Sequence, residues 1–380
     1  MKRDIIATVP EELIISGTIV YGDEFEPIEG YLCIKDNVIR EVGTDTRVDA
    51  QLTGLVAPCF VNAHTHIGDS VLKDPPVSDL DSLVKPPNGL KHKVLNNTPK
   101  NVLKDAMGRT LEDMVLSGTC MFCDFREGGI KGASIISELL GTFKNITGMV
   151  MGRPGMPDEL IIGELDNLLG TCGGLGFSGV NDVPYHILEE AVHTAHDAGK
   201  LFAIHAGEKD TSDIPGAIGL EPDFIVHMTY AGDAHIKDLA DAHIPAVVCP
   251  RSNFVTGVGS PRRPPIQKML DMGITVGVGT DNVMLNSANM FSEMEFLSKV
   301  YKLDDRQVFK LCTLSGAKIL GTDEDIGSIV NGKHATIMVL DDESPNLSNS
   351  SDPVASLVRR GRPDDIKAII NGNGGIIHGK

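Results

Sequence analysis

The chain has 380 residues, of which 41% are hydrophobic, enough for one large globular domain with a small appendage. Its formal net charge of −18 argues against nucleic acid or an anionic membrane surface as a partner, because both attract basic patches. Residues 1–17 contain Pro10, Glu11 and Glu12, which interrupt any signal-peptide-like run, and no stretch has the roughly 18 apolar residues of a membrane span. Seven dispersed cysteines, an odd number, argue against a disulfide framework, so a cytoplasmic protein is predicted.

Short β-rich pieces stand near both ends of the chain. They are residues 13–21, 30–35, 38–42, 335–340 and 366–372. Turn residues such as Lys35-Asp36-Asn37 separate the early ones. We therefore expect the two ends, residues 1–56 and 326–380, to form one small β-sandwich domain.

Between the ends, strand-like and helix-like runs alternate, which is typical of a parallel sheet covered by helices. The expected strands are 201–205, 224–227, 246–249 and 275–279, and the expected helices are 187–198, 235–242 and 266–272. His205, His227 and Cys249 follow one another at steps of 22 residues, about one βα unit each. This repetition predicts a (β/α)8 barrel over residues 57–325. Residues 74–99 lack periodicity and are expected to form a long loop after the first barrel strand, a frequent place for a lid.

The segment Pro58-Cys59-Phe60-Val61-Asn62-Ala63-His64-Thr65-His66 is an apolar strand that ends in two histidines. Residues two apart on a strand face the same side, so His64 and His66 can bind one ion together. The pair alone leaves a metal site and an ordinary surface pair equally open.

Three further polar residues end later strands, namely His205, His227 and Asp281. A single histidine at a strand end is more often a hydrogen-bonded structural residue. In a barrel, however, these strand ends converge on one mouth, and five such groups together favour a site. Glu208 follows His205 through Ala206-Gly207, in the loop above that mouth, where a carboxylate can move protons.

Other motifs leave alternatives open. Cys120 and Cys123 form a C-x-x-C motif, but no second pair exists and the flanking residues indicate a buried strand rather than a redox or zinc site. Arg126 and Arg251 either reach the pocket to bind substrate or form structural ion pairs.

The ordered motifs resemble the amidohydrolase superfamily, within it the cytosine, guanine and adenosine-type deaminases and their chlorohydrolase-like relatives. The motifs are H-x-H at 64 and 66, H-x-G-E at 205–208, His227, Cys249-Pro250-Arg251-Ser252-Asn253, and Gly279-Thr280-Asp281-Asn282. The resemblance implies that one metal is bound by His64, His66, His205 and Asp281. It also implies that His227 contacts the attacking water or the developing oxyanion. Asn282, which directly follows Asp281, is a further candidate substrate contact.

The number and kind of metal follow from the same resemblance. Dinuclear relatives bridge two ions with a carboxylated lysine on a middle strand, and no lysine occurs here between Lys144 and Lys200. One divalent ion per chain, Zn²⁺ or Fe²⁺, is therefore expected, with the ion lowering the pKa of a bound water. Asp281 would take a proton from that water, and Glu208 would protonate the ring nitrogen beside the amino-bearing carbon.

These inferences predict a metal-dependent aminohydrolase that releases ammonia from a purine, pyrimidine, nucleoside or related heterocycle. The alternative is hydrolysis of an amide C–N bond or a C–Cl bond at the same mononuclear site. Glu208 favours deamination, because leaving ammonia needs a proton and leaving chloride does not. A barrel kept only as a binding scaffold is disfavoured, because every metal-binding and proton-transfer residue is present. Relatives of this kind commonly assemble, so a homo-oligomer is expected.

Overall fold

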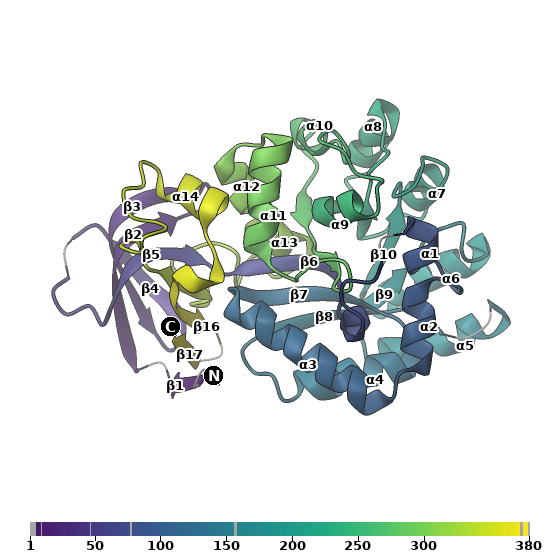
Figure 1. The fold of residues 1–380 in the computed structure, drawn as a ribbon, viewed down its shortest axis with the longest axis horizontal. Helices are drawn as coiled ribbons and strands as arrows, with labels where there is room; N and C mark the ends of the chain where they lie inside the picture. Colours follow the sequence, from purple (N-terminus) through teal and green to yellow (C-terminus); the bar gives the residue numbers. More distant parts are fainter. Residues whose placement is uncertain are drawn as a thin grey trace.

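The computed structural model describes residues 5–8, 10–45, 47–76, 78–155, 158–372 and 375–378. The strands fall into two separate sheets, an eight-stranded one at one end of the molecule and a nine-stranded one that forms a barrel (Figure 1). Purple and yellow segments, from the two ends of the chain, lie together in the smaller sheet (Figure 1). The prediction that both ends of the chain together form a small β domain is confirmed. Residues 1–4, 9, 46, 373–374 and 379–380 of its predicted range lie outside the described residues.

The eight-stranded sheet has the order β1-β17-β16-β15-β5-β2-β3-β4. Its strands are β1 (Ile5–Thr8), β2 (Glu12–Tyr21), β3 (Glu26–Lys35), β4 (Val38–Gly43), β5 (Leu52–Pro58), β15 (Ile337–Leu340), β16 (Ile366–Asn371) and β17 (Gly375–His378). The sheet curls around its own hydrophobic core, so that residues at the start of β4 contact the segment that precedes β15. There the Ile39 amide donates to the Lys333 carbonyl at 2.9 Å, and the Ala335 amide donates to the Asn37 carbonyl at 2.8 Å.

The barrel strands run parallel to their neighbours in the order in which they occur in the chain. They are β6 (Phe60–His66), β7 (Thr119–Arg126), β8 (Thr147–Gly152), β9 (Gly174–Phe177), β10 (Leu201–Ala206), β11 (Phe224–His227), β12 (Ala246–Val248), β13 (Val276–Val278) and β14 (Asp281–Asn282). β13 pairs with β12, and β14, two residues later, pairs with β6. β13 and β14 are thus one interrupted eighth strand that closes the predicted (β/α)8 barrel.

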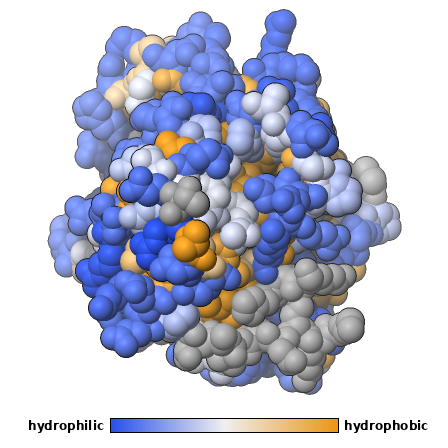
Figure 2. Space-filling model, turned by 90° about the vertical axis from the view of Figure 1, so that its left-hand side faces the viewer, coloured by the Kyte–Doolittle hydropathy of each residue, from blue (hydrophilic) through white to orange (hydrophobic). Residues whose placement is uncertain are grey.

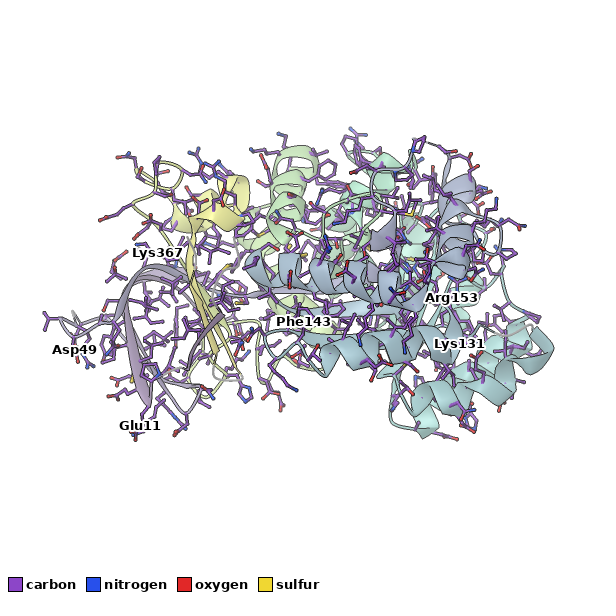
Figure 3. The ribbon with its side chains drawn as sticks, turned by 60° about the horizontal axis from the view of Figure 1, so that its bottom comes forward. Glu11, Asp49, Lys131, Phe143, Arg153 and Lys367 are labelled. Carbon is purple, nitrogen blue, oxygen red and sulfur yellow. The ribbon has the colours of Figure 1, made fainter. Side chains whose placement is uncertain are left out.

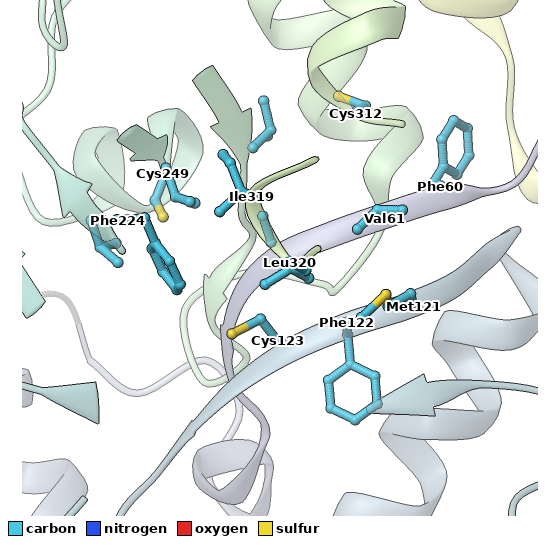
Figure 4. Packing of buried hydrophobic residues seen from close by; sticks show 14 of the residues in the cluster. Phe60, Val61, Met121, Phe122, Cys123, Phe224, Cys249, Cys312, Ile319 and Leu320 are labelled. Carbon is cyan, nitrogen blue, oxygen red and sulfur yellow. The ribbon is translucent and has the colours of Figure 1, made fainter. Parts of the chain in front are cut away.

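Helices cover the outside of the barrel, as Figure 1 shows. They are α3 (Lys100–Leu116), α4 (Gly129–Leu140), α5 (Asp158–Leu169), α6 (Tyr185–Asp197), α7 (Ile214–Gly219), α8 (Asp233–Asp241), α9 (Pro250–Val255), α10 (Ile266–Asp271), α11 (Met290–Phe296), α12 (Asp305–Leu311) and α13 (Leu314–Ile319), with α14 (Pro353–Arg360) beside α11 and α12. Every residue of β6 and β7 is buried, including the polar residues near their carboxyl ends. Figure 4 shows Phe60 and Val61 of β6 and Met121 and Phe122 of β7 in this core.

The segment after β6 differs from the expected loop. It contains a 3-10 turn at Ile67–Val71 and two short helices, α1 (Leu80–Val84) and α2 (Leu90–Asn97). Asp79 begins α1 by accepting a hydrogen bond from the Ser82 amide at 3.0 Å. The prediction of a long loop over 74–99 is therefore wrong, because the segment contains two helices. The segment does lie beside the barrel mouth, the position of a lid.

The end of the molecule formed by the small sheet presents mainly hydrophilic residues to solvent, with apolar residues in small separate patches (Figure 2). Among the helices that the structure describes, none is both long and apolar enough to cross a membrane.

Candidate metal centre and active site

Four donor atoms meet at the carboxyl ends of the barrel strands, the end turned away from the small sheet. The Nε2 atoms of His64 and His205 lie 3.2 Å apart. Asp281 Oδ1 lies 3.5 Å from Nε2 of His64 and 3.6 Å from Nε2 of His66. Ligand atoms of the three histidines all lie within 4.8 Å of one another, and all four residues are buried. The structure thus brings together the predicted ligand set.

The contact between the first and last barrel strands places Asp281 beside the H-x-H motif. Asp281 is paired with Thr65 in the sheet. The Asn62 side chain holds this contact from both sides, because it donates to Thr280 Oγ1 at 2.8 Å and accepts from the Thr280 amide at 3.0 Å. A Cβ on Gly279 would lie 2.5 Å from the Cβ of His64, so only glycine permits this approach of the two strands.

Backbone carbonyl groups orient two of the histidines. His205 Nδ1 lies 2.7 Å from the Phe177 carbonyl oxygen, and His66 Nδ1 lies 3.1 Å from the Phe125 carbonyl oxygen. A carbonyl only accepts, so each Nδ1 carries the proton and each Nε2 directs a lone pair toward the centre. Burial lowers the pKa values of His64, His66 and His205, that of His66 to about 3, so these imidazoles are neutral near pH 7.

Asp281 is the anionic member of the cluster. Burial alone would raise its pKa, but the hydrogen bond with His64 and the surrounding imidazoles hold the pKa well below its usual range. Ser252 donates to the second oxygen, Oδ2, at 2.6 Å and leaves Oδ1 facing the histidines. The φ angles of Asp281 (59°) and His227 (82°) are positive, a strained conformation for residues other than glycine that the surrounding structure must hold in place.

Neutral imidazole nitrogens and one carboxylate are the donors that Zn²⁺ and Fe²⁺ accept. His64 directs Nε2 toward His205 Nε2 and Asp281 Oδ1, whereas its Nδ1 has no hydrogen-bond partner in the described part of the chain, so Nε2 is the atom of this buried side chain that would bind the metal. The donor set and its protonation therefore fit a divalent metal.

Glu208 and His227 face each other beside this cluster. Glu208 Oε2 lies 3.5 Å from His227 Nε2. Gly207 makes the bend after β10 with a φ of +67°, and its amide donates to Asp213 Oδ1 at 2.8 Å. Burial, and next the negative charge of Asp281, raise the pKa of Glu208 to about 8. The carboxyl group can therefore carry a proton at neutral pH.

A pocket of about 240 Å³ opens above these groups. His66, His205, Glu208, His227, Asp281 and Asn282 form its floor, and α1, α2 and the loops after β8, β9 and β10 form its walls. The lining is mostly charged or polar, and no Phe, Tyr or Trp occurs among the described residues that form it. Arg153 lies in the wall, at the opposite end of the molecule from Lys367 of the small sheet (Figure 3).

Behind His66 lies a buried charge network that sequence reasoning missed. Glu127 Oε1 is 2.8 Å from His66 Nδ1 and 2.8 Å from Lys91 Nζ of α2, and Arg126 pairs with the other oxygen, Oε2. These charges hold the pKa of Glu127 well below its usual range against the opposing effect of burial. Glu127 directly follows β7, so the strand-end rule that found His205 also applies to it. Nothing in the sequence around Lys91 signals its burial.

The candidate substrate contacts lie in different places. Arg126 is buried in ion pairs with Asp124 and Glu127, and Arg251 pairs with Glu293 at 3.3 Å; neither arginine lines the pocket. Asn282 does line it, and its side chain donates to Asp69 Oδ2 at 2.9 Å. The two cysteines of the C-x-x-C motif are free thiols on the buried strand β7.

Comparison with known families identifies the chain. A model of the amidohydrolase family matches residues 55–373. The chain belongs to the amidohydrolase family. This assignment confirms the resemblance inferred from the motifs and makes the protein a hydrolase of the class that acts on non-peptide C–N bonds.

Individual proteins support the same assignment. An uncharacterized protein of Methanocaldococcus jannaschii is 33% identical over 375 residues, which cover 93% of this chain and 96% of that protein. A 5-methylthioadenosine/S-adenosylhomocysteine deaminase of Pyrococcus furiosus is 26% identical, with 97% of this chain and 96% of that protein covered. The crystal structure of an adenosine deaminase from Xanthomonas campestris with bound zinc has a TM-score of 0.82 at 18% identity, covering 97% and 93% of the two chains. That last similarity concerns the fold.

Proposed function

We propose that this amidohydrolase is a divalent-metal-dependent aminohydrolase that displaces an amino group, as ammonia, from a small heterocycle. The observation that carries the proposal is the position of Glu208. Its Oε2 lies 3.5 Å from His227 Nε2, in the floor of the pocket, which three of the four predicted metal ligands also line. A carboxyl group there can give a proton to a bound ring and recover it later.

Each residue has a separate part in this reaction. His64, His66, His205 and Asp281 would hold one Zn²⁺ or Fe²⁺ ion, which supplies a water nucleophile activated near neutral pH. Asp281 accepts a proton from the attacking water, while Glu208 protonates the ring nitrogen next to the amino-bearing carbon. As the new C–O bond forms and the C–N bond breaks, the proton taken up by Asp281 passes to the amino group, which leaves as ammonia. The hydroxyl proton of the adduct returns to Glu208, so that a carbonyl remains on the ring and the enzyme is restored. His227 donates a hydrogen bond to the oxygen where negative charge develops.

The pocket supports a polar substrate. Its charged walls, which include Arg153 and Asp182, and its lack of aromatic side chains among the described lining residues favour hydrogen bonding over stacking. The Arg153 guanidinium makes no direct ion pair with the described residues, so it is available to a ligand. We infer an aminated purine, pyrimidine or nucleoside, and the deaminases among the relatives make adenosine derivatives the first class to test.

Hydrolysis of an amide or of a C–Cl bond by the same cluster is the second candidate. Such a reaction would use the metal ligands and Asp281 but would not need a proton donor at Glu208 when chloride leaves. The raised pKa of Glu208, to about 8, supports the first candidate, because a protonated carboxyl group is the form required for deamination.

We place the reaction in the cytoplasm, since all seven cysteines are free and buried. The expected homo-oligomer stays a prediction, to be checked by sedimentation at micromolar concentration.

The experiment that tests the proposal is a screen for ammonia release by the zinc- or iron-loaded protein against nucleobases, nucleosides, pterins, and S-adenosyl and methylthio-adenosine compounds. Glu208→Gln keeps the size of the side chain but cannot carry the proton, so kcat should fall by at least about 100-fold with metal content unchanged. Glu189→Gln, on the exposed face of α6, is the matched control. Ammonia release by Glu208→Gln within a few-fold of wild type would contradict the role of Glu208.

A further inference from the structure

The amide of Asn253 lies between His227 and Thr229. Asn253 Nδ2 is 3.3 Å from His227 Nδ1, and Thr229 Oγ1 donates to Asn253 Oδ1 at 3.0 Å. All three residues are at most 1% exposed. Neither Asn253 nor Thr229 lines the pocket, so this arrangement lies behind His227, on the side away from a substrate.

The donors and acceptors of these three side chains determine which of their atoms carry the hydrogens. The Thr229 hydroxyl hydrogen needs an acceptor. Among the described residues, the acceptor at hydrogen-bond distance is Asn253 Oδ1. This fixes the orientation of the amide, so its NH₂ group faces His227. An NH₂ group only donates, and Nδ1 of His227 must therefore accept. A neutral imidazole has one N–H, which consequently lies on Nε2.

We propose that Asn253 is a positioning residue that sets the tautomer of His227, so that the imidazole presents an Nε2–H to the pocket. That hydrogen points toward the side on which Glu208 Oε2 lies, 3.5 Å away. The neutral ring then acts as a hydrogen-bond donor to a developing oxyanion and has no lone pair on the pocket side to bind the metal. The catalytic consequence rests on the proposed function, whereas the tautomer does not.

The backbone around Asn253 is suited to this task. Asn253 lies on α9, directly after Ser252, which binds Asp281 Oδ2. The Asn253 carbonyl accepts from the Gly259 amide at 2.7 Å and from Thr256 Oγ1 at 3.2 Å, which holds the residue in place. Two successive residues of one short helix thus orient two different groups of the active site.

The direct test is the ¹⁵N NMR spectrum of the zinc-loaded protein with labelled histidine side chains. The His227 signals are assigned by their loss in His227→Gln. The Nε2–H tautomer is expected in wild type, and an Nδ1–H tautomer in wild type would overturn the proposal. Because this readout needs no turnover, it stands or falls separately from the proposed reaction.

Two variants test the causal role of Asn253. Asn253→Asp replaces the donor with a carboxylate that only accepts, so His227 should move its proton to Nδ1 or become doubly protonated. Asn253→Ala should give a mixture of tautomers, and it serves as the test if the aspartate variant does not fold. With an active substrate, kcat of Asn253→Asp should fall about 10²- to 10⁴-fold while KM changes much less.

Asn167→Asp makes the same chemical change on the exposed side of α5 and should leave the His227 signals unchanged. Folded, zinc-loaded Asn253→Asp and Asn253→Ala proteins that both keep the wild-type tautomer would refute the assignment.

Discussion

Lys91 Nζ lies 2.8 Å from Glu127 Oε1, the same oxygen that lies 2.8 Å from Nδ1 of the expected metal ligand His66. The lid helix α2 is therefore joined to the metal centre through one buried carboxylate. Both side chains are almost completely buried, so solvent screens this contact little.

Glu127→Gln should weaken metal binding. The substitution removes the negative charge that makes His66 a better donor of its Nε2 lone pair, and partners of this kind typically account for about 10- to 100-fold in affinity. A chelator competition titration measures the change. The control is Glu138→Gln. Glu138 lies on the surface of α4 and forms an exposed ion pair with Lys100. A folded Glu127→Gln protein with the affinity of wild type would show that Glu127 does not support His66.

Lys91→Met should loosen the lid. Removal of one partner from a buried ion pair typically costs about 3–5 kcal/mol, and the loss should lie near the low end because Glu127 keeps Arg126 and His66. Hydrogen exchange should quicken in α1 and α2 more than in the barrel strands. Lys85→Met changes an exposed lysine of the same segment, and equal exchange in the two variants would contradict a specific role for Lys91.

His64→Ala should lose most of the metal. Wild-type protein purified without chelator should carry close to one equivalent of zinc or iron per chain, because the four expected ligands converge at the strand ends and Asp281 is shared with the second buried group that could bind an ion, His227 and Cys249. Elemental analysis measures both quantities. His193→Ala, at an exposed ion pair with Asp197, should keep the wild-type content. Two ions per wild-type chain, or a fully loaded His64→Ala protein, would refute this ligand set.

The rate of ammonia release should depend on the protonation of Glu208. Its pKa is raised to about 8 by burial and by the charge of Asp281, so the acid form that donates the proton prevails below that pH and is lost above it. We therefore expect kcat to decrease as pH rises through about 8. Glu208→Gln should lack this limb in a pH–rate profile, and a wild-type kcat that increases through the same range would be inconsistent with a proton donor here.

Glu293 should make stability depend on pH. It is fully buried on α11, and burial raises its pKa to about 7 in the folded protein despite Arg251. An unfolded chain would lose this proton near pH 4.5, so the folded state binds more protons between those values and its stability decreases as pH rises. The gain in melting temperature from Glu293→Gln should be larger at pH 8 than at pH 5. Equal effects at both pH values in the metal-free protein would contradict the raised pKa.

The barrel is predictable from the sequence because its strands are short, apolar and regularly spaced. The expected strand 224–227 matches β11, and the expected helix 266–272 matches α10 within one residue. In a barrel, side chains near the carboxyl ends of the strands lie at one mouth. The convergence of His64, His205 and Asp281 therefore follows from the predicted topology.

The lid and the charge network could not be predicted in this way. α1 has five residues, too few for a periodic signal, and the buried residue of α2 is Lys91. A lysine is buried only when a distant partner compensates its charge, here Glu127. For the same reason, the sequence could not tell whether Arg126 contacts the pocket or forms an ion pair. Only the three-dimensional structure shows that its guanidinium lies against Asp124 and Glu127.

The pairing of Asp281 with Thr65 has a consequence for biosynthesis. During translation His64 and His66 leave the ribosome early, whereas Asp281 and the strand that closes the barrel emerge only after six further barrel strands. Domains generally fold as units as the chain emerges, so the nascent chain holds an incomplete, all-histidine site for most of its synthesis. Metal loading of the complete four-residue site therefore belongs to the end of translation or after it, because Asp281 is the last of the four expected ligands to be synthesised.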